Sequence, residues 1–410
     1  MMMSNQEEER KQQVAATEGA AKAIYDDDVT STQVKKNEVI AVLGYGIQGR
    51  AQASNLSDSG FRVVVGLRKG GKSWDLAKSD GHKVMDVVEA AKAADIIHML
   101  VPDMVQGDVY REIEPYVTPG KALSFSHGAA IHWGWIKSPP GVDVFMVAPK
   151  APGQRVREVY LQGFGTPSIV AVHQDATGRA WDRTLELAKG IGSTRAGVIK
   201  TTFKEETESD WFGEQVDLCG GVDRLIRKAF EVLVENGYQP EIAYFECLHE
   251  LKLIVDLIQR YGISGMYRGV SETARFGGLT VGGNVINEET KERMRSALRD
   301  IQSGAFADRW VNAYKNEQAR AFEKYMDELD AHPIEQVGRR LRRMMWPEDA
   351  LQSQSSKVAS WSKLQQQHGE RKGGAITRKS GKATSSSRAV ASKKTQRKQR
   401  RKTTTTRGRK

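Results

Sequence analysis

The hydrophobic pattern of residues 24–200 predicts short buried strands separated by helices. The chain between the strands is long enough for crossover helices, and this alternation is typical of a doubly wound, mostly parallel sheet. We therefore predict an α/β domain over residues 24–200. The apolar runs that predict its strands are Val39–Leu43, Arg62–Gly66, Asp95–Leu100, Lys121–Phe125, Asp143–Val147 and Ser168–Val172.

After residue 200 the spacing of the apolar positions changes. Segments such as "EIAYFECLHELKLIVDLIQRYG" place apolar residues at i, i+3, i+4 and i+7, and Gly, Pro and Asn stand at the breaks. This period indicates amphipathic helices. We predict an all-helical second domain over residues 201–347.

The two ends of the chain lack such periodicity. Residues 1–23 are a polar extension, and residues 348–410 are rich in Ser, Thr, Gln and Lys, so this tail is predicted to be disordered. Residues 351–410 hold 18 Lys or Arg and one acid, Glu370, a net charge of +17. Since the whole chain carries +11, residues 1–350 carry −6. The positive net charge of the whole chain therefore comes from the tail.

The sequence also argues against a secreted or membrane-spanning protein. The N-terminus has neither an apolar signal segment nor a basic amphipathic presequence, and the chain contains no apolar run of about 20 residues that could span a bilayer. Cys219 and Cys247 show no CxxC spacing, which indicates reduced thiols. We expect a soluble, cytoplasmic protein without membrane contact.

The first motif that carries chemistry is "GYGIQG", Gly44–Gly49. Glycines at this spacing permit a tight turn and close approach of the backbone to a pyrophosphate, while the following helix directs its first N–H groups at the phosphates. A lone GxGxxG is a weak signal, but here it follows a strand and opens a helix. Dinucleotide binding in a Rossmann-type domain is favoured over a plain glycine turn.

The end of the second strand indicates which dinucleotide is bound. An NAD-preferring site usually has Asp or Glu here, whereas "GLRKGGKSW" supplies Arg68, Lys69, Lys72 and Ser73 and no acid. Cations and a hydroxyl suit a 2′-phosphate, which favours NADPH. The alternative is a solvated basic loop without a ligand.

Two pairs of carboxylates have the same spacing. Asp210 and Glu214 are four residues apart in "ETESDWFGEQ", and Glu246 and Glu250 repeat this in "YFECLHELK". Like charges at i, i+4 destabilise a helix, so these pairs call for a cation. An all-carboxylate ligand set favours Mg²⁺ over Zn²⁺.

The alternative for this acidic stretch is a solvated first helical turn, in which carboxylates are favourable near the helix N-terminus. We prefer that interpretation for Glu205, Glu206 and Glu208. It suits Glu246 and Glu250 less well, because apolar residues flank them.

The motifs together resemble one enzyme family. "GYGIQGRAQASNL", "SHGAAIHWG", "VAPKAPG", "FKEETESDWFGEQVDLCGG", "YFECLHELKLIVDLI" and "GVSETARFG" are similar to those of ketol-acid reductoisomerase, or acetohydroxy-acid isomeroreductase. The resemblance covers residues 24–347 in order, and the single helical domain matches the short-chain, class I form. In that family the helical domain is knotted and dimerises.

The resemblance implies a two-stage reaction with NADPH and two Mg²⁺ ions. An alkyl group migrates within 2-acetolactate or 2-aceto-2-hydroxybutyrate, and a hydride from NADPH then reduces the resulting keto acid. The products, 2,3-dihydroxyisovalerate and 2,3-dihydroxy-3-methylvalerate, lead to valine, isoleucine and leucine. The base that removes the hydroxyl proton stays open between His127, Glu250 and a metal-bound hydroxide.

The resemblance also assigns roles to residues of the reacting centre. His127 and Lys150 match active-site positions, Asp210 and Glu214 match metal ligands, and Glu246 and Glu250 match acids that complete the metal site. In the family this last pair and the serine matched by Ser271, which binds substrate, come from the partner subunit of a homodimer or larger homo-oligomer. The cofactor positions that match are Gly44, Tyr45, Gly46, Ile47, Gln48, Gly49, Arg68, Lys72, Ser73, Asp103, Met104, Val105, Gln106 and Gly153.

Two other functions remain to be weighed. Another Rossmann-type hydroxy-acid dehydrogenase would share the cofactor motif but need no Mg²⁺. The basic tail could add non-specific contact with nucleic acid or another polyanion, or it could be a solubilising extension.

Overall fold

The computed structural model describes residues 21–317 and 320–346, which belong to one compact unit within residues 1–364. The polar extension up to residue 20 and the basic tail from residue 348 lie outside the described residues. Among the described helices, none is long and apolar enough to cross a membrane.

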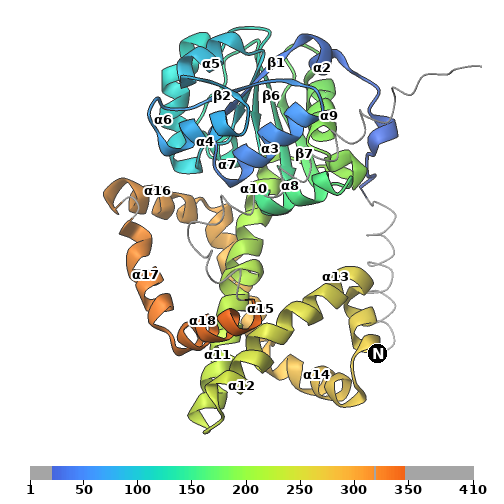
Figure 1. Cartoon of the computed structure of the whole chain (residues 1–410), viewed down its shortest axis with the longest axis vertical. Helices are drawn as coiled ribbons and strands as arrows, with labels where there is room; N and C mark the ends of the chain where they lie inside the picture. The colour runs from blue at the N-terminus through green and yellow to red at the C-terminus, as the bar shows by residue number, and fades with distance from the viewer. Residues whose placement is uncertain (1–20, 318–319, 347–410) are drawn as a thin grey trace, which may run out of the picture. The chain divides into compact units, whose positions relative to one another are not determined.

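The N-terminal part of the unit is built around one eight-stranded sheet with helices on both sides (Figure 1). The strand order is β3-β2-β1-β4-β5-β6-β7-β8, and all neighbours are parallel except β6 and β7. This confirms the predicted doubly wound fold. The strands are β1 (Val39–Leu43), β2 (Arg62–Gly66), β3 (Lys83–Met85), β4 (Ile96–Met99), β5 (Ala122–Phe125), β6 (Asp143–Pro149), β7 (Ser168–Gln174) and β8 (Val198–Lys200).

The helices of this part cover the two faces of the sheet. Alternate residues of β1 show the division, because Ile40 and Val42 belong to one apolar core and Ala41 and Leu43 to the other. The helices are α2 (Gln33–Asn37), α3 (Ile47–Asp58), α4 (Lys72–Ser79), α5 (Val87–Ala93), α6 (Asp103–Ile113), α7 (Ala129–His132), α8 (Gly153–Leu161) and α9 (Ala180–Gly190). The 3₁₀ turns are Asp26–Asp28, Glu114–Tyr116 and Ser193–Arg195.

The C-terminal part is helical, as the apolar period predicts. Its helices are α10 (Phe203–Gly213), α11 (Gly220–Glu235), α12 (Pro240–Tyr244), α13 (Glu250–Gly269), α14 (Glu272–Val285), α15 (Glu288–Gln302), α16 (Ala305–Glu317), α17 (Arg320–Ala331) and α18 (Pro333–Met345). The start of α10 packs on the sheet, where Phe203 joins the core that also contains Leu43.

Two π-helical segments interrupt the helices, and the sequence pattern did not predict them. The first is Glu214–Leu218, between α10 and α11, and the second is Phe245–His249, between α12 and α13. In each, an N–H bonds the carbonyl five residues back: Cys219 to Glu214, and Glu250 to Phe245. Such turns occur frequently at functional sites. Glu214 and Glu246 lie in these segments, Glu250 directly follows the second, and Asp210 lies one helical turn before the first.

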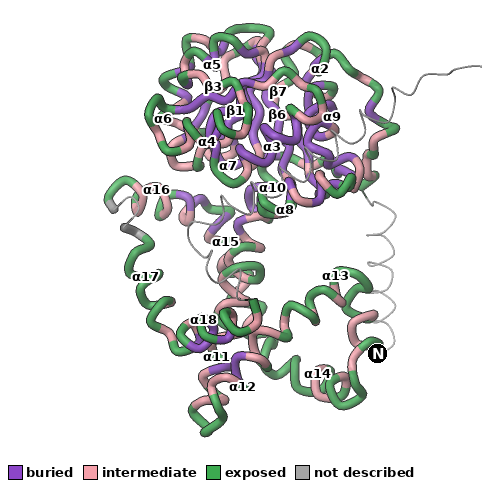
Figure 2. The backbone as a smooth tube through the Cα atoms, in the orientation of Figure 1, coloured by how far each residue is buried: buried purple, intermediate pink, exposed green. Residues whose placement is uncertain are grey.

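Helices α13 and α14 contain no buried residue (Figure 2). They nevertheless carry large apolar side chains in contact with solvent, among them Leu253, Ile263, Phe276 and Leu279. Phe276 is 72% exposed. An apolar surface of this kind marks an interaction site.

Candidate active site

The glycine turn joins β1 to α3, and its glycines serve different purposes. At Gly44 φ is +101°, and a Cβ would lie 2.6 Å from the Leu100 carbonyl oxygen, so only glycine fits. A Cβ at Gly49 would lie 2.3 Å from the Gly44 oxygen. At Gly46 φ is ordinary and a Cβ would meet nothing within 4 Å. The fold's own packing therefore leaves room at Gly46 for a ligand to approach the backbone.

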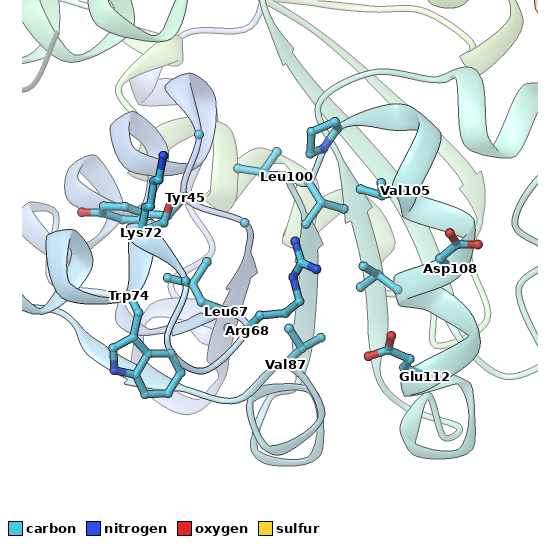
Figure 3. A pocket seen from close by; sticks show the side chains of 18 residues that line it. Tyr45, Leu67, Arg68, Lys72, Trp74, Val87, Leu100, Val105, Asp108 and Glu112 are labelled. Carbon is cyan, nitrogen blue, oxygen red and sulfur yellow. The ribbon is translucent and has the colours of Figure 1, made fainter. Parts of the chain in front are cut away.

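Beside this turn lies a cleft of about 570 Å³ (Figure 3). Arg68 extends into it from the end of β2, while Asp108 and Glu112 of α6 lie on the opposite wall. Lys72 and Ser73 begin α4, where the first backbone N–H groups have no acceptor within the helix. A cleft with two cations, a hydroxyl and a helix N-terminus suits a phosphorylated ribose. The predicted cofactor residues that line it are Gly44, Tyr45, Gly46, Arg68, Lys72, Ser73 and Val105.

Tyr45 is anchored by a partner that the sequence did not reveal. Its hydroxyl donates to Asp80 Oδ2 at 2.8 Å, and Arg50 Nε donates to the same oxygen at 2.7 Å. Burial, followed by the negative charge of Asp80, raises the pKa of Tyr45. The ring therefore stays neutral and holds the glycine turn in place. Asp80 and Arg50 are 30 residues apart in sequence, and Asp80 stands outside the motifs that the sequence analysis singled out.

The remaining predicted cofactor residues lie in or around the turn. Ile47 is exposed at the start of α3, and Gln48 Nε2 donates to the Ala151 carbonyl at 2.9 Å. A Cβ at Gly153 would lie 2.2 Å from the Ile47 oxygen, so the start of α8 rests directly on the turn. Asp103, Met104 and Gln106 form the first turn of α6 with Val105, and Gln106 donates to Asp103 at 3.0 Å.

A cluster of four charged side chains lies where α10 packs against the sheet. Lys150 Nζ bridges Glu206 Oε1 at 3.0 Å and Asp210 Oδ1 at 2.9 Å. His127 Nδ1 lies 3.0 Å from Glu206 Oε2 and 3.5 Å from Asp210 Oδ2. Lys150 follows β6, and His127 follows β5. The structure thus brings together three predicted site residues, His127, Lys150 and Asp210, around Glu206.

Glu206 is a correction to the sequence analysis. We predicted that Glu205, Glu206 and Glu208 are solvated, but only Glu205 is exposed, whereas Glu206 is 1% and Glu208 8% exposed. The loop at Gly128 covers this face of α10, and its N–H donates to Glu206 at 2.8 Å. Glu208 faces His132 at 3.5 Å.

Charge coupling sets the protonation states in the cluster. Burial alone would lower the pKa of His127, but the hydrogen bond and charge of Glu206, with Asp103 and Asp210, raise it to about 9. Burial would likewise raise the pKa of Glu206, yet His127 and Lys150 hold it below its usual value. At neutral pH the cluster therefore combines the imidazolium of His127 and the ammonium of Lys150 with the ionised carboxylate of Glu206.

Glu214 is linked to the cluster by charge and remains partly open to solvent. Its pKa is raised first by desolvation and then by the negative charge of Asp210. The pKa of Asp103 is raised by burial, against the charge of His127. Asp103 therefore places a further carboxylate close to the cluster from the cofactor side.

The other predicted site residues are not part of this cluster within the described chain. Glu246 and Glu250 are exposed at the second π-helical segment and the start of α13. Ser271 is exposed and caps α14 by accepting from the Ala274 N–H at 3.2 Å. All three therefore lie on the surface of the described chain.

The donor set of the cluster fits a metal ion. His127, Glu206 and Asp210 can each offer a ligand atom within 4.8 Å of the others. Most of the donors are carboxylate oxygens, which suit Mg²⁺. Lys150 and protonated His127 neutralise these carboxylates, so His127 could act as a metal ligand only after losing its proton.

Family comparisons agree with this architecture. A family model described as acetohydroxy acid isomeroreductase, NADPH-binding domain, matches residues 34–197. A second, described as ketol-acid reductoisomerase, C-terminal domain, matches residues 203–346.

Individual relatives match along nearly their whole length. A ketol-acid reductoisomerase (NADP(+)) of Cenarchaeum symbiosum is 64% identical over 79% of this chain and 98% of its own. That of Nitrosopumilus maritimus is 61% identical over 79% and 97%. The solved structure of an NADH-preferring ketol-acid reductoisomerase from an uncultured archean superposes with a TM-score of 0.76 at 45% identity, covering 78% of this chain and 98% of that one. The chain belongs to the ketol-acid reductoisomerase family.

Proposed function

We propose that the cluster around Glu206 is the half of the catalytic centre that one chain of this enzyme supplies. As a family member the chain is an NADP-dependent ketol-acid reductoisomerase, which isomerises and reduces acetohydroxy acids in branched-chain amino-acid synthesis. The observation that carries the proposal is the convergence of His127, Lys150 and Asp210 on one buried carboxylate. We also infer that residues 24–200 and 201–347 are the cofactor domain and the metal and substrate domain.

The chain's own residues would hold the metal and orient the substrate. Asp210 and Glu214, with Glu206 behind them, would hold Mg²⁺, which supplies Lewis-acid polarisation of the substrate oxygens when bound. Lys150 lies within reach of both Glu206 and Asp210 and presents a positive charge where an alkoxide develops. Glu206 fixes the ring of His127 through Nδ1, and His127 Nε2, buried without a partner in the described chain, is free to meet substrate.

The cofactor cleft supports NADPH in particular. Arg68 and Lys72 provide cations and Ser73 a hydroxyl, and no carboxylate follows β2 directly to accept from a ribose 2′-hydroxyl. The turn at Gly46 provides the open backbone for the pyrophosphate.

The experiment that tests the activity is NADPH oxidation with 2-acetolactate. We expect turnover with Mg²⁺, none in excess chelator, and a loss of at least about a hundredfold in Asp210→Asn, which removes a ligand charge. Turnover that persists in chelator would favour a metal-independent hydroxy-acid dehydrogenase. No turnover with Mg²⁺ would refute the proposal.

A second copy of the chain would complete the centre. Glu246, Glu250 and Ser271 are exposed next to the apolar surface of α13 and α14, as expected if a partner subunit covers them. We infer a homodimer in which each site takes Asp210 from one chain and Glu246 from the other.

Mixing two inactive variants tests the shared site. In a hybrid of Asp210→Asn with Glu246→Gln, one of the two sites contains both native carboxylates. Random exchange should therefore restore about a quarter of the parent activity. If the mixture stays inactive although hybrids form, the carboxylates act within one chain and the shared site is wrong.

A further inference from the structure

The first π-helical segment, Glu214–Leu218, is followed at once by two glycines. Gly220 and Gly221 begin α11, although glycine is the poorest helix former after proline. Neither residue has a positive φ, so the backbone conformation does not require glycine at either place. Another constraint must act on these positions.

That constraint is steric and comes from the π turn itself. A Cβ at Gly220 would lie 2.2 Å from the Gln215 carbonyl oxygen, and one at Gly221 would lie 2.0 Å from the Val216 oxygen. Contacts below 3.0 Å essentially never occur, and the colliding atoms are backbone, which cannot turn aside as a side chain can. The wide turn exists because two successive residues lack a Cβ.

The π turn is the joint between two anchored helices. On one side, α10 is held to the sheet through Glu206, which binds Gly128, His127 and Lys150. On the other, α11 packs through Phe230 in a core with Tyr244 of α12 and Leu341 of α18. Because both helices are anchored, a side chain that collides with this turn should distort the turn itself rather than move either helix.

Glu214 lies at that joint. Its carbonyl accepts the Cys219 N–H at 3.1 Å and so closes the π turn, whereas Asp210 lies one turn earlier in the anchored part of α10. The position of the Glu214 carboxylate relative to Asp210 therefore depends on the shape of the turn.

We propose that Gly220 and Gly221 are positioning residues that fix the Glu214 carboxylate beside Asp210 for metal binding. The proposal rests on the proposed function, because it takes Asp210 and Glu214 as ligands of Mg²⁺. The glycines touch neither metal nor substrate and act through the π turn.

Calorimetric titration of the full chain with Mg²⁺ tests the proposal. Gly221→Ala and Gly220→Ala should bind Mg²⁺ about tenfold or more weakly than the parent, as when groups that orient a ligand are lost. Gly213→Ala is the matched control, because its Cβ would meet only Leu218 Cδ1 at 3.6 Å, an ordinary contact. It should bind Mg²⁺ like the parent, and all three variants should bind NADPH like the parent.

A double-mutant cycle asks whether the glycines act through Glu214. Glu214→Gln should weaken Mg²⁺ binding in the parent but add little in Gly221→Ala, where the carboxylate is already displaced. Additive losses would overturn the proposal. So would parent-like Mg²⁺ binding in Gly221→Ala, or unfolding of both alanine variants at 25 °C, which would assign the glycines to folding alone. Absence of Mg²⁺ binding by the parent would instead refute the proposed function.

Discussion

Glu206 organises the charges of the site. It is almost fully buried, and it accepts from a backbone N–H, an imidazole and an ammonium. Removing its charge leaves Asp210 as the one remaining ion-pair partner of Lys150 in the cluster, and leaves His127 with the weaker effects of Asp210 and Asp103. An unpaired charge in a buried position is costly.

Glu206→Gln should therefore lower the free energy of unfolding by roughly 2–4 kcal/mol. Chemical denaturation measures this loss. The matched control is Glu205→Gln, because Glu205 is the exposed neighbour and its replacement should cost less than about 0.5 kcal/mol. Equal stability of the two variants would contradict the central place of Glu206.

The raised pKa of His127 predicts a pH dependence of stability in metal-free protein. The folded pKa of about 9 lies above the unfolded value of about 6.5, so protonation of His127 favours the folded state. This contribution is complete below about pH 6.5, declines above it and is lost above about pH 9.

In chelator, the stability advantage of the parent over His127→Gln should shrink as pH rises from about 6 to about 10. Urea unfolding across this range provides the measurement. If the stability advantage of the parent stays constant or grows with pH, Glu206 does not raise the pKa of His127.

We expect the loop between β2 and α4 to determine the preference between NADPH and NADH. Arg68 points into the cleft, while its neighbour Lys69 is exposed and does not line it. Arg68→Asp should lower kcat/KM for NADPH by about tenfold or more and affect NADH much less, because a carboxylate repels a 2′-phosphate.

Lys69→Asp makes the same change of charge and should leave the ratio between the two cofactors nearly unchanged. Steady-state kinetics with both cofactors gives these ratios. If the two variants behave alike, the preference reflects the general charge of the loop and not contact at Arg68.

The exposed apolar surface of helix α14 leads to a prediction: a negative charge placed there should weaken the association of two chains. Phe276→Glu places a carboxylate at the most exposed large apolar residue of the described chain and should break the proposed homodimer, with loss of turnover. Light scattering after gel filtration reports the mass. Phe164→Glu is the control, since Phe164 is also exposed but lies outside α13 and α14, and it should leave the dimer intact.

The elements also show what sequence patterns can and cannot reveal. β1 and β2 were predicted with their observed bounds, because apolar runs of five residues are clear signals. β3 and β8 have three residues each and were missed, since so short an edge strand has no recognisable period. The π-helical segments were missed as well, because one extra residue in a turn barely alters the apolar pattern.

The site residues also differ in how far the sequence reveals their role. His127, Lys150 and Glu206 all stand in motifs that resemble the family, but the burial of Glu206 depends on Gly128, which is 78 residues away in sequence. A signal was nevertheless present: Glu206, Asp210 and Glu214 follow one another at intervals of four and share a helix face. The pattern was missed because the sequence alone does not show that the loop at Gly128 covers this face of α10.

At the scale of the whole molecule, the part of the chain that the family models match ends before the basic tail. The second family model stops at residue 346, and the Cenarchaeum relative matches 79% of this chain. Deleting residues 351–410 should therefore leave kcat within about twofold of the parent and abolish any retention on DNA at low salt. Activity assays and DNA gel shifts measure the two properties, and unchanged DNA binding would exclude the tail as the source.

The contact of Gly153 with Ile47 and the bond from Gln48 to Ala151 join two loops that the reaction uses separately. The first loop is the one that we propose binds the cofactor, and the second carries Lys150. Because these contacts join the loops, a cofactor that restricts the motion of the glycine turn should also restrict the position of Lys150. NADPH that binds first is therefore expected to help hold the Lys150 loop in position before the acetohydroxy acid binds.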